Sequence, residues 1–193
     1  NIDLFLSISP ELYLKRLIVG GFEKVYSIGK NFRNEGIDRS HNPEFTMMEC
    51  YSAYNDYNYG MKFCKELINF IVKDVNKSLK VKYQDVILDF GKWNKFSYCE
   101  LIKKYAKIDL LKISENDLIK KVREMNLVKL KGINNPTKEQ IIEAIFDEHV
   151  QNNLMQPTIV YDYPIELCPL TKKKRGNEKL AERFEPYVYC MEI

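Results

Sequence analysis

The 193-residue sequence contains no apolar run of the roughly 18 residues that a membrane helix needs, and no basic start followed by an apolar stretch that would indicate a signal peptide. An excess of one charge is also missing: 30 Lys and Arg stand against 27 Asp and Glu, and the net charge of +3 does not indicate nucleic acid binding by itself. A hydrophobic content of 45% with 30% charged residues is typical of a globular protein. The length predicts one core and one domain with room for an insertion.

The cysteines are few, and their spacing matches no known metal-binding or disulfide motif. The five cysteines are scattered and form no C-x-x-C pair, which argues against a zinc site. Their odd number favours free thiols in a reducing compartment over a disulfide framework. We therefore expect a cytoplasmic protein, or one in an organelle matrix after processing. Because the chain begins at Asn1 without methionine and stops at Ile193 within an apparent strand, we also expect it to be a piece of a longer protein.

The apolar periodicity predicts an ordered series of elements. A helix is expected to start with Ser9 as its N-cap and Pro10 in its first turn, and to end at Gly20-Gly21. Further predicted elements are a helix over 59–75, a short hairpin over 81–83 and 86–88, three lysine-rich helices near 98–105, 115–125 and 138–151, and β-rich segments over 158–161 and 184–193. We divide the chain into residues 1–89, a helical insertion over 90–152, and a return to the first domain over 153–193.

Two predicted strands carry charged and aromatic side chains on one face. In residues 25–35 the even positions are mostly apolar and the odd positions are small or polar, and successive side chains of a strand point to opposite faces. After an eight-residue polar loop the odd positions carry an aromatic ring, a carboxylate and a phenol. A hairpin would bring a set of these side chains around one cleft: Arg33, Glu35, Phe45, Glu49 and Tyr51. The alternative is an ordinary hairpin whose polar face meets solvent.

The residues themselves point to a family. The string FRNEGIDRSHNPEFT over 32–46 resembles motif 2 of the class II aminoacyl-tRNA synthetases. Its continuation MMECY over 47–51, with AYNDY over 53–57, resembles the lysine-specific branch of that family. Upstream SPELYLKRL over 9–17 and GGF over 20–22, and downstream PL at 169–170 and ERFE over 182–185 through Glu192, fit the same family. The resemblance covers nearly the whole chain.

The resemblance implies an α+β fold in which an antiparallel sheet is flanked by helices and interrupted by a helical insertion. It implies a ligase that activates L-lysine with ATP and Mg²⁺ as lysyl-adenylate and passes the lysyl group to tRNA(Lys), working as a homodimer in its full-length form. Motifs 1 and 3 and the anticodon-binding barrel of the family are not recognisable here. We therefore expect a truncated catalytic domain that is weak or inactive by itself.

The resemblance also assigns an ATP site. Arg33 is the expected catalytic residue, since a guanidinium can bridge the substrate carboxylate and the α-phosphate as negative charge builds up between them. Glu35 would accept a hydrogen bond from the adenine amino group, and Phe45 would stack on the purine. The outer phosphates would contact loop residues, namely Arg39, His41 and Asn42. The alternatives are a surface ion pair between Arg33 and Glu35 and a core role for Phe45.

Lysine recognition follows from charge. A buried cation needs a partner, so a lysine site requires carboxylates at both ends of the substrate. Glu11 would pair with the α-ammonium group, Arg33 would hold the carboxylate, and Glu49 with Tyr51 would receive the ε-ammonium group. Glu11 also suits a helix N-terminus, which is the alternative interpretation of that residue.

Glu185 and Glu192 resemble the acidic Mg²⁺ ligands of the family. Oxygen ligands and few protein contacts suit this ion. A separation of seven residues does not fit one face of a regular strand, so a bulge or bend must intervene if both side chains bind the metal. The alternative is that both are solvated surface glutamates.

Three other functions remain open. A paralogue of the same fold could attach lysine to a protein instead of tRNA. An aspartate or asparagine enzyme shares the motif 2 architecture, although Glu49 beside Tyr51 argues against an acidic substrate. The chain could also belong to a non-catalytic module that binds nucleotide or lysine.

Overall fold

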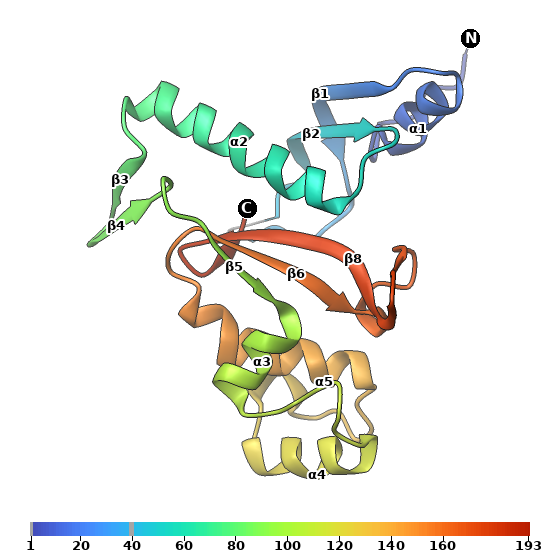
Figure 1. Cartoon of the computed structure of the whole chain (residues 1–193). Coiled ribbons are helices and arrows are strands. Elements are labelled where there is room, and N and C mark those ends of the chain that lie inside the picture. The colour runs from blue at the N-terminus through green and yellow to red at the C-terminus, as the bar shows by residue number, and fades with distance from the viewer. Residues whose placement is uncertain (1, 39–40) are drawn as a thin grey trace. The chain divides into compact units, whose positions relative to one another are not determined.

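The computed structural model describes residues 2–38 and 41–193 (Figure 1). The chain separates into two compact units, Asn1–Asn55 and Asp56–Ile193, and each is described by itself. Helices and mainly antiparallel strands alternate along the chain, so the predicted α+β class is confirmed. No helix in the described ranges combines the length and the apolar character needed to cross a membrane.

The first unit consists of one helix and one hairpin. Helix α1 (Glu11–Val19) is followed by antiparallel strands β1 (Lys24–Phe32) and β2 (Glu44–Ser52). The register runs from Lys24 opposite Ser52 to Phe32 opposite Glu44, so odd-numbered residues of one strand pair with odd-numbered residues of the other. Because paired residues share a face of the sheet, all odd-numbered side chains of the hairpin lie on one side.

Helix α1 and the segment before it cover this odd face. Leu14 of α1 is buried, and the hydroxyl of Ser7 donates to the side-chain oxygen of buried Asn31 at 3.0 Å. The even face carries exposed apolar side chains, with Tyr26 at 72% and Ile28 at 62% of full exposure. The face that carries the polar groups is therefore the more enclosed one in this unit.

The start of α1 differs from the prediction. Pro10, not Ser9, occupies the N-cap position and makes no side-chain cap. The Ser9 hydroxyl accepts a hydrogen bond from the backbone N–H of Glu11 at 3.1 Å. Ser9 therefore satisfies one backbone N–H of the first helical turn, although it lies one residue before the N-cap. The helix ends as predicted at the glycine pair, where Gly21 has a φ of 101° that favours glycine.

The second unit is built on a five-stranded sheet. Its strand order is β5 (Asn94–Ser97), β6 (Thr158–Pro164), β8 (Asn177–Val188) and β7 (Lys173–Lys174), with β9 (Met191–Glu192) paired to β8. Only the β5–β6 pair is parallel. A separate hairpin, β3 (Lys80–Tyr83) with β4 (Val86–Asp89), matches the predicted one.

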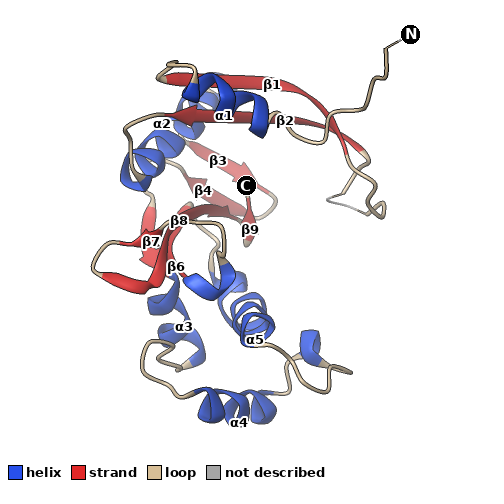
Figure 2. Ribbon diagram, turned by 90° about the vertical axis from the view of Figure 1, so that its right-hand side faces the viewer, coloured by secondary structure: helices blue, strands red, loops and turns tan. Residues whose placement is uncertain are grey.

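Helices cover both faces of this sheet (Figures 1 and 2). Helix α2 (Tyr57–Asn76) approaches one face closely: a Cβ added at Gly60 would lie 2.8 Å from the ring of Phe184. On the other face lie α3 (Tyr98–Ala106) and α5 (Lys138–Ile145), and α4 (Glu115–Met125) lies beyond them. The helical path continues from α5 through a π-helical turn, Phe146–Val150, and a 3-10 turn, Gln151–Asn153, so the three predicted helices are confirmed. A further 3-10 turn, Val128–Leu130, and another, Ile165–Leu167, complete the elements.

The main core lies between the sheet and α3 and α5. Most of its fully buried side chains are branched aliphatics from both layers, including Leu101, Ile102, Ile142, Ile145 and Val160. The break between units falls at Asn55, not at residue 89. The division into 1–89, 90–152 and 153–193 concerns the family's domains and stays a prediction.

Candidate active site

The hairpin of the first unit holds Glu49 in a fixed orientation. Glu49 pairs with Ser27 on the odd face, next to Tyr51, which pairs with Val25. The Ser9 hydroxyl donates to Oε1 of Glu49 at 2.7 Å, and the Tyr51 hydroxyl donates to Oε2 at 2.9 Å. A carboxylate has about four acceptor positions, so both oxygens are oriented and can still accept from a cation.

Tyr51 is held as a hydrogen-bond donor. Burial raises the pKa of its hydroxyl, and the hydrogen bond to Glu49 and the negative charges of Glu49 and Glu11 raise the pKa further. The hydroxyl therefore keeps its proton at neutral pH and presents it to the carboxylate of Glu49.

Glu11 lies close to this pair. It is the first residue of α1, and its carboxylate forms an ion pair with Lys15, one turn along the helix. The ammonium group of Lys15 is 5.9 Å from the centre of the Tyr51 ring. The structure thus brings together Glu11, Glu49 and Tyr51, with a lysine of the chain itself beside them. The position of Glu11 in the first turn also fits the helix-end interpretation.

Arg33 lies one step beyond β1. Its backbone N–H donates to the carbonyl of Pro43 at 3.0 Å and extends the ladder by one rung. Its guanidinium carbon is 5.2 Å from the centre of the Phe45 ring, a cation–π contact on the odd face. Within residues 2–38 and 41–193, no ion pair joins Arg33 to Glu35.

Glu35 does not belong to the strand face. The strand predicted over 25–35 ends at Phe32, and the backbone N–H of Glu35 turns back to the carbonyl of Arg33 at 3.1 Å. The ladder stops because Pro43, opposite Arg33, has no N–H to donate. The expectation that alternation carries Glu35 onto the same face as Glu49 is therefore wrong, and Glu35 is an exposed loop residue.

Asp38 and His41 contact each other in the described part of the loop. The Nδ1 of His41 lies 2.9 Å from Asp38, and the backbone N–H of His41 donates to Asp38 at 2.8 Å. The hydrogen bond and the negative charge of Asp38 raise the pKa of the imidazole above its ordinary value. Asn42 is exposed beside it, whereas Arg39 lies outside the described residues.

In the second unit a chain reversal brings Glu185 and Glu192 to one face. Tyr189 and Cys190 adopt left-handed φ angles of 52° and 61° between β8 and β9. Both central residues of the tightest hairpin turn have such angles. Glu192 of β9 pairs with Tyr187 of β8. Tyr187 lies two residues after Glu185 on the same strand, so the side chains of Glu185, Tyr187 and Glu192 share one face of the sheet. The required bend is a hairpin turn, not a bulge.

Glu185 is buried, and its carboxylate is held by neighbouring side chains. It is 8% exposed, accepts hydrogen bonds from the hydroxyls of Tyr163 at 2.6 Å and Tyr187 at 3.1 Å, and forms an ion pair with Arg183. Burial raises the pKa of Glu192, and the charge of Glu185 raises it further. The two carboxylates line a hollow of about 210 Å³, and the acidic side chains of Glu143 and Asp147 line it too.

The donor set fits Mg²⁺ as a pair of carboxylates and not as a full cage. The described residues contain no group of three or more His, Cys, Asp or Glu side chains arranged to hold a metal. Mg²⁺ is usually bound through one or two carboxylates and keeps water and substrate phosphates as its other ligands. Burial is the main cause of the raised pKa of Glu192 and the charge of Glu185 adds to it, and a divalent cation would relieve the repulsion between the two carboxylates.

Several residues of these clusters were not identified from the sequence. Ser9 was assigned to the helix cap, and no local signal links it to Glu49, forty positions away. Lys15 could have been found from its i,i+4 spacing to Glu11. Tyr187 could have been found two residues after Glu185 on the same face, whereas Tyr163 comes from another strand and carries no such signal.

The sequence of the chain matches one class of protein over its whole length. The sequence model of the class II tRNA synthetases (D, K and N) covers residues 1–193, and the chain belongs to this family. Among curated proteins, the chain is 47% identical to the lysine–tRNA ligase of Clostridium kluyveri and 48% identical to that of Clostridium novyi, each over 195 residues. The lysine–tRNA ligase of Clostridium tetani is 46% identical. The whole chain is matched but spans only about two fifths of each relative's length, 38–39%.

Proposed function

We propose that this chain is part of a lysine–tRNA ligase, which uses ATP to activate L-lysine as lysyl-adenylate and transfers the lysyl group to tRNA(Lys). One observation supports the lysine assignment most directly. Glu49 is fixed by two hydroxyl donors and remains able to accept from an ammonium group, and it lies on the same hairpin face as Phe45, whose ring contacts the guanidinium of Arg33. The relatives that match the whole chain carry the same activity in their names.

At the lysine end, Glu49 would accept from the ε-ammonium group while Tyr51 keeps the carboxylate in place. Glu11 would take the α-ammonium group, exchanging its ion pair with Lys15 for one with the substrate. A site built on such polar contacts rejects analogues that lack the amine by a factor of about 10⁴ or more.

At the ATP end, Arg33 would bridge the lysine carboxylate and the α-phosphate. The oxygen of the carboxylate attacks phosphorus and pyrophosphate leaves, so positioning and charge stabilisation supply most of the catalysis. Phe45 would stack on adenine, a contact worth about 1–3 kcal/mol. Glu35 would accept from the adenine amino group. The outer phosphates would contact His41 in its protonated form, Asn42 and Arg39.

Class II tRNA synthetases use ATP and Mg²⁺. Glu185 and Glu192 would hold this ion, which supplies positive charge against the phosphate oxygens when bound. The homodimer of the full-length enzyme, the tRNA(Lys) partner and a cytoplasmic location belong to the same proposal.

The test is amino-acid-dependent exchange of pyrophosphate into ATP, measured on the full-length natural protein with each of the twenty amino acids. We expect exchange with lysine, and we expect Glu49→Gln to raise the KM for lysine about 10- to 100-fold, because a hydrogen bond to a charged group contributes about 1.5–3 kcal/mol. Glu44→Gln is the matched control, since Glu44 is an exposed carboxylate on the even face of the same strand, paired with Lys30.

Other outcomes would identify the alternatives. Exchange with aspartate or asparagine would contradict the lysine assignment and retain the family. Exchange with lysine but no charging of tRNA(Lys) would favour a paralogue that modifies a protein. No exchange with any amino acid would favour a module that only binds nucleotide or lysine.

A further inference from the structure

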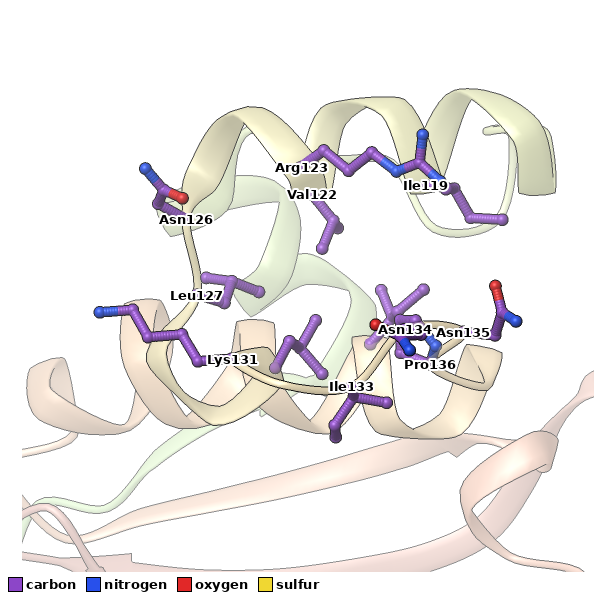
Figure 3. Close-up of a pocket in the computed structure, with 12 residues that line it drawn as sticks. Ile119, Val122, Arg123, Asn126, Leu127, Lys131, Ile133, Asn134, Asn135 and Pro136 are labelled. Carbon is purple, nitrogen blue, oxygen red and sulfur yellow. The ribbon is translucent and has the colours of Figure 1, made fainter.

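A hollow of about 370 Å³ lies in the helical region, far along the chain from every residue of the proposed active site (Figure 3). It is open to solvent on one side and is bordered by α4, by α5 and by the segment that connects them. Its floor is aliphatic, formed by Ile119, Val122, Leu127, Leu130, Ile133 and Ile141. Val122 and Leu127 point into the space between the two helices. This volume lies at the small end of the roughly 300–1,000 Å³ that ligand sites occupy.

The wall of the hollow is held in place before any ligand arrives. The backbone N–H groups of Val128 and Lys129 donate to Glu148 at 3.0 and 2.9 Å. The N–H of Ile133 donates to the carbonyl of Leu130 at 3.1 Å, across a turn at Gly132 whose φ of 84° favours glycine. The connecting segment is therefore tied to the π-helical turn that follows α5 and to itself, which reduces the ordering cost of binding.

The charge at the rim has one sign. Arg123 and Lys131 line the hollow, and no carboxylate does. Neither forms an ion pair in the part of the chain that the structure describes, although other lysines of this region do, such as Lys103 with Asp109 and Lys138 with Glu166. Arg123 runs along α4 toward Ile119, one turn away on the same helix face, whereas Lys131 extends outward at the edge.

The lining also indicates what the hollow does not suit. No Phe, Tyr or Trp lines it, so it offers no ring on which a nucleic acid base could stack. Branched aliphatic side chains instead suit a compact hydrocarbon body. The side-chain amides of Asn126, Asn134 and Asn135 at the rim can accept or donate hydrogen bonds to a polar end.

We propose that this hollow binds a small organic acid, with its apolar body between α4 and α5 and its carboxylate on the guanidinium of Arg123. The proposal is independent of the ligase activity, because no residue of the hollow belongs to the proposed active site.

The experiment titrates the 193-residue chain with phenylbutyrate and follows backbone amide shifts by nuclear magnetic resonance. Phenylbutanol and phenylbutylamine serve as neutral and cationic probes of matched size. We expect phenylbutyrate to shift the amides of α4 and of residues 127–136 and to bind more tightly than the other two probes. Arg123→Gln should weaken phenylbutyrate binding about tenfold, the loss expected for a charge-assisted hydrogen bond, and leave phenylbutanol binding unchanged.

Lys120→Gln is the matched control, since Lys120 is an exposed cation of α4 outside the hollow, and it should leave binding unchanged. Circular dichroism would verify that both variants fold. Binding of phenylbutanol as tight as that of phenylbutyrate, shifts confined to other residues, or no binding of any probe would overturn the proposal. Tighter binding of a capped Leu-Asp dipeptide than of phenylbutyrate would also overturn it, by assigning the hollow to a protein segment.

Discussion

Single hydroxyl groups decide how the carboxylate of Glu49 is presented. Ser9 and Tyr51 each donate to a different oxygen, so the carboxylate cannot rotate without losing a hydrogen bond. Tyr51 lies two residues away on the same strand face, and its contribution follows from the alternation of a strand. Ser9 contributes only because α1 and the residues before it lie over the hairpin.

Replacement of Ser9 by Ala should therefore weaken lysine binding. A neutral hydrogen bond contributes about 0.5–1.5 kcal/mol, so we expect the KM for lysine in pyrophosphate exchange to rise about 2- to 10-fold, with little change in the KM for ATP. Ser7→Ala is the control, because Ser7 donates to Asn31 and not to Glu49. Equal effects of the two substitutions would show that Ser9 acts only through the stability of the unit.

His41 gives the proposed phosphate contacts a pH dependence. Asp38 raises the pKa of the imidazole, so its positive charge persists to a higher pH than that of an ordinary histidine. Attraction to the phosphates is complete below this pKa and is lost as pH rises through it. We expect the KM for ATP to increase over that range.

The Asp38→Asn variant tests the cause of this shift. The substitution removes the negative charge and lowers the pKa of His41, so the rise in KM should begin at lower pH than in the parent. His41→Asn should remove that dependence. The measurement is the KM for ATP as a function of pH, and identical profiles for Asp38→Asn and the parent would show that His41 does not govern phosphate binding.

Individual elements of the helical region are stabilised by side chains at their ends. Helix α3 begins with a reciprocal capping box, in which Ser97 accepts from the N–H of Glu100 and Glu100 accepts from the N–H of Ser97. Helix α5 repeats the arrangement with Thr137 and Gln140. Such caps fix where a helix starts, and helix starts fix which side chains reach the core.

Loss of the α3 cap has a measurable cost. We expect Ser97→Ala to lower the free energy of unfolding by about 1 kcal/mol, because it leaves a backbone N–H of the first turn without its acceptor. Chemical denaturation followed by circular dichroism measures the change. Glu100→Gln is the control, since glutamine retains the reciprocal hydrogen bond. A loss as large for Glu100→Gln would indicate that charge at the helix end, and not the cap, carries the stabilisation.

At the scale of the whole chain, burial is distributed unequally between the two units. In the first unit the only described residues that are buried are Leu14 and Asn31, whereas both hydrophobic clusters belong to the second unit. Regions with few buried apolar contacts open at a lower free energy than packed cores. The hairpin that carries the proposed lysine and ATP residues is therefore the less stable part.

Hydrogen–deuterium exchange tests this difference. We expect the amides of β1 and β2 to exchange faster than those of β6 and α3 in the 193-residue chain. In the full-length protein, ATP with lysine should slow exchange in β1 and β2, because ligands stabilise the state that they bind. Uniform protection across the chain without ligand would contradict the unequal distribution of stability.

Local patterns in the sequence were sufficient for most of the elements. Period-2 alternation predicted the β1–β2 hairpin and placed Phe45, Glu49 and Tyr51 on one face, because a strand has only two faces. Apolar periodicity predicted α3, α4 and the helical path from Lys138. Alternation failed for Glu35, since a proline on the opposite strand ended β1 three residues earlier than the pattern indicated.

The sequence by itself determined the family, the hairpin and the identity of the candidate site residues, because motifs and strand periodicity are local properties. Only the tertiary structure decided that Ser9 holds Glu49, that Tyr163 from another strand holds Glu185, and that a two-residue turn brings Glu192 alongside it. It also decided where α4 and α5 leave a hollow. These contacts join residues far apart along the chain, and their formation depends on how whole elements pack, which no local pattern encodes.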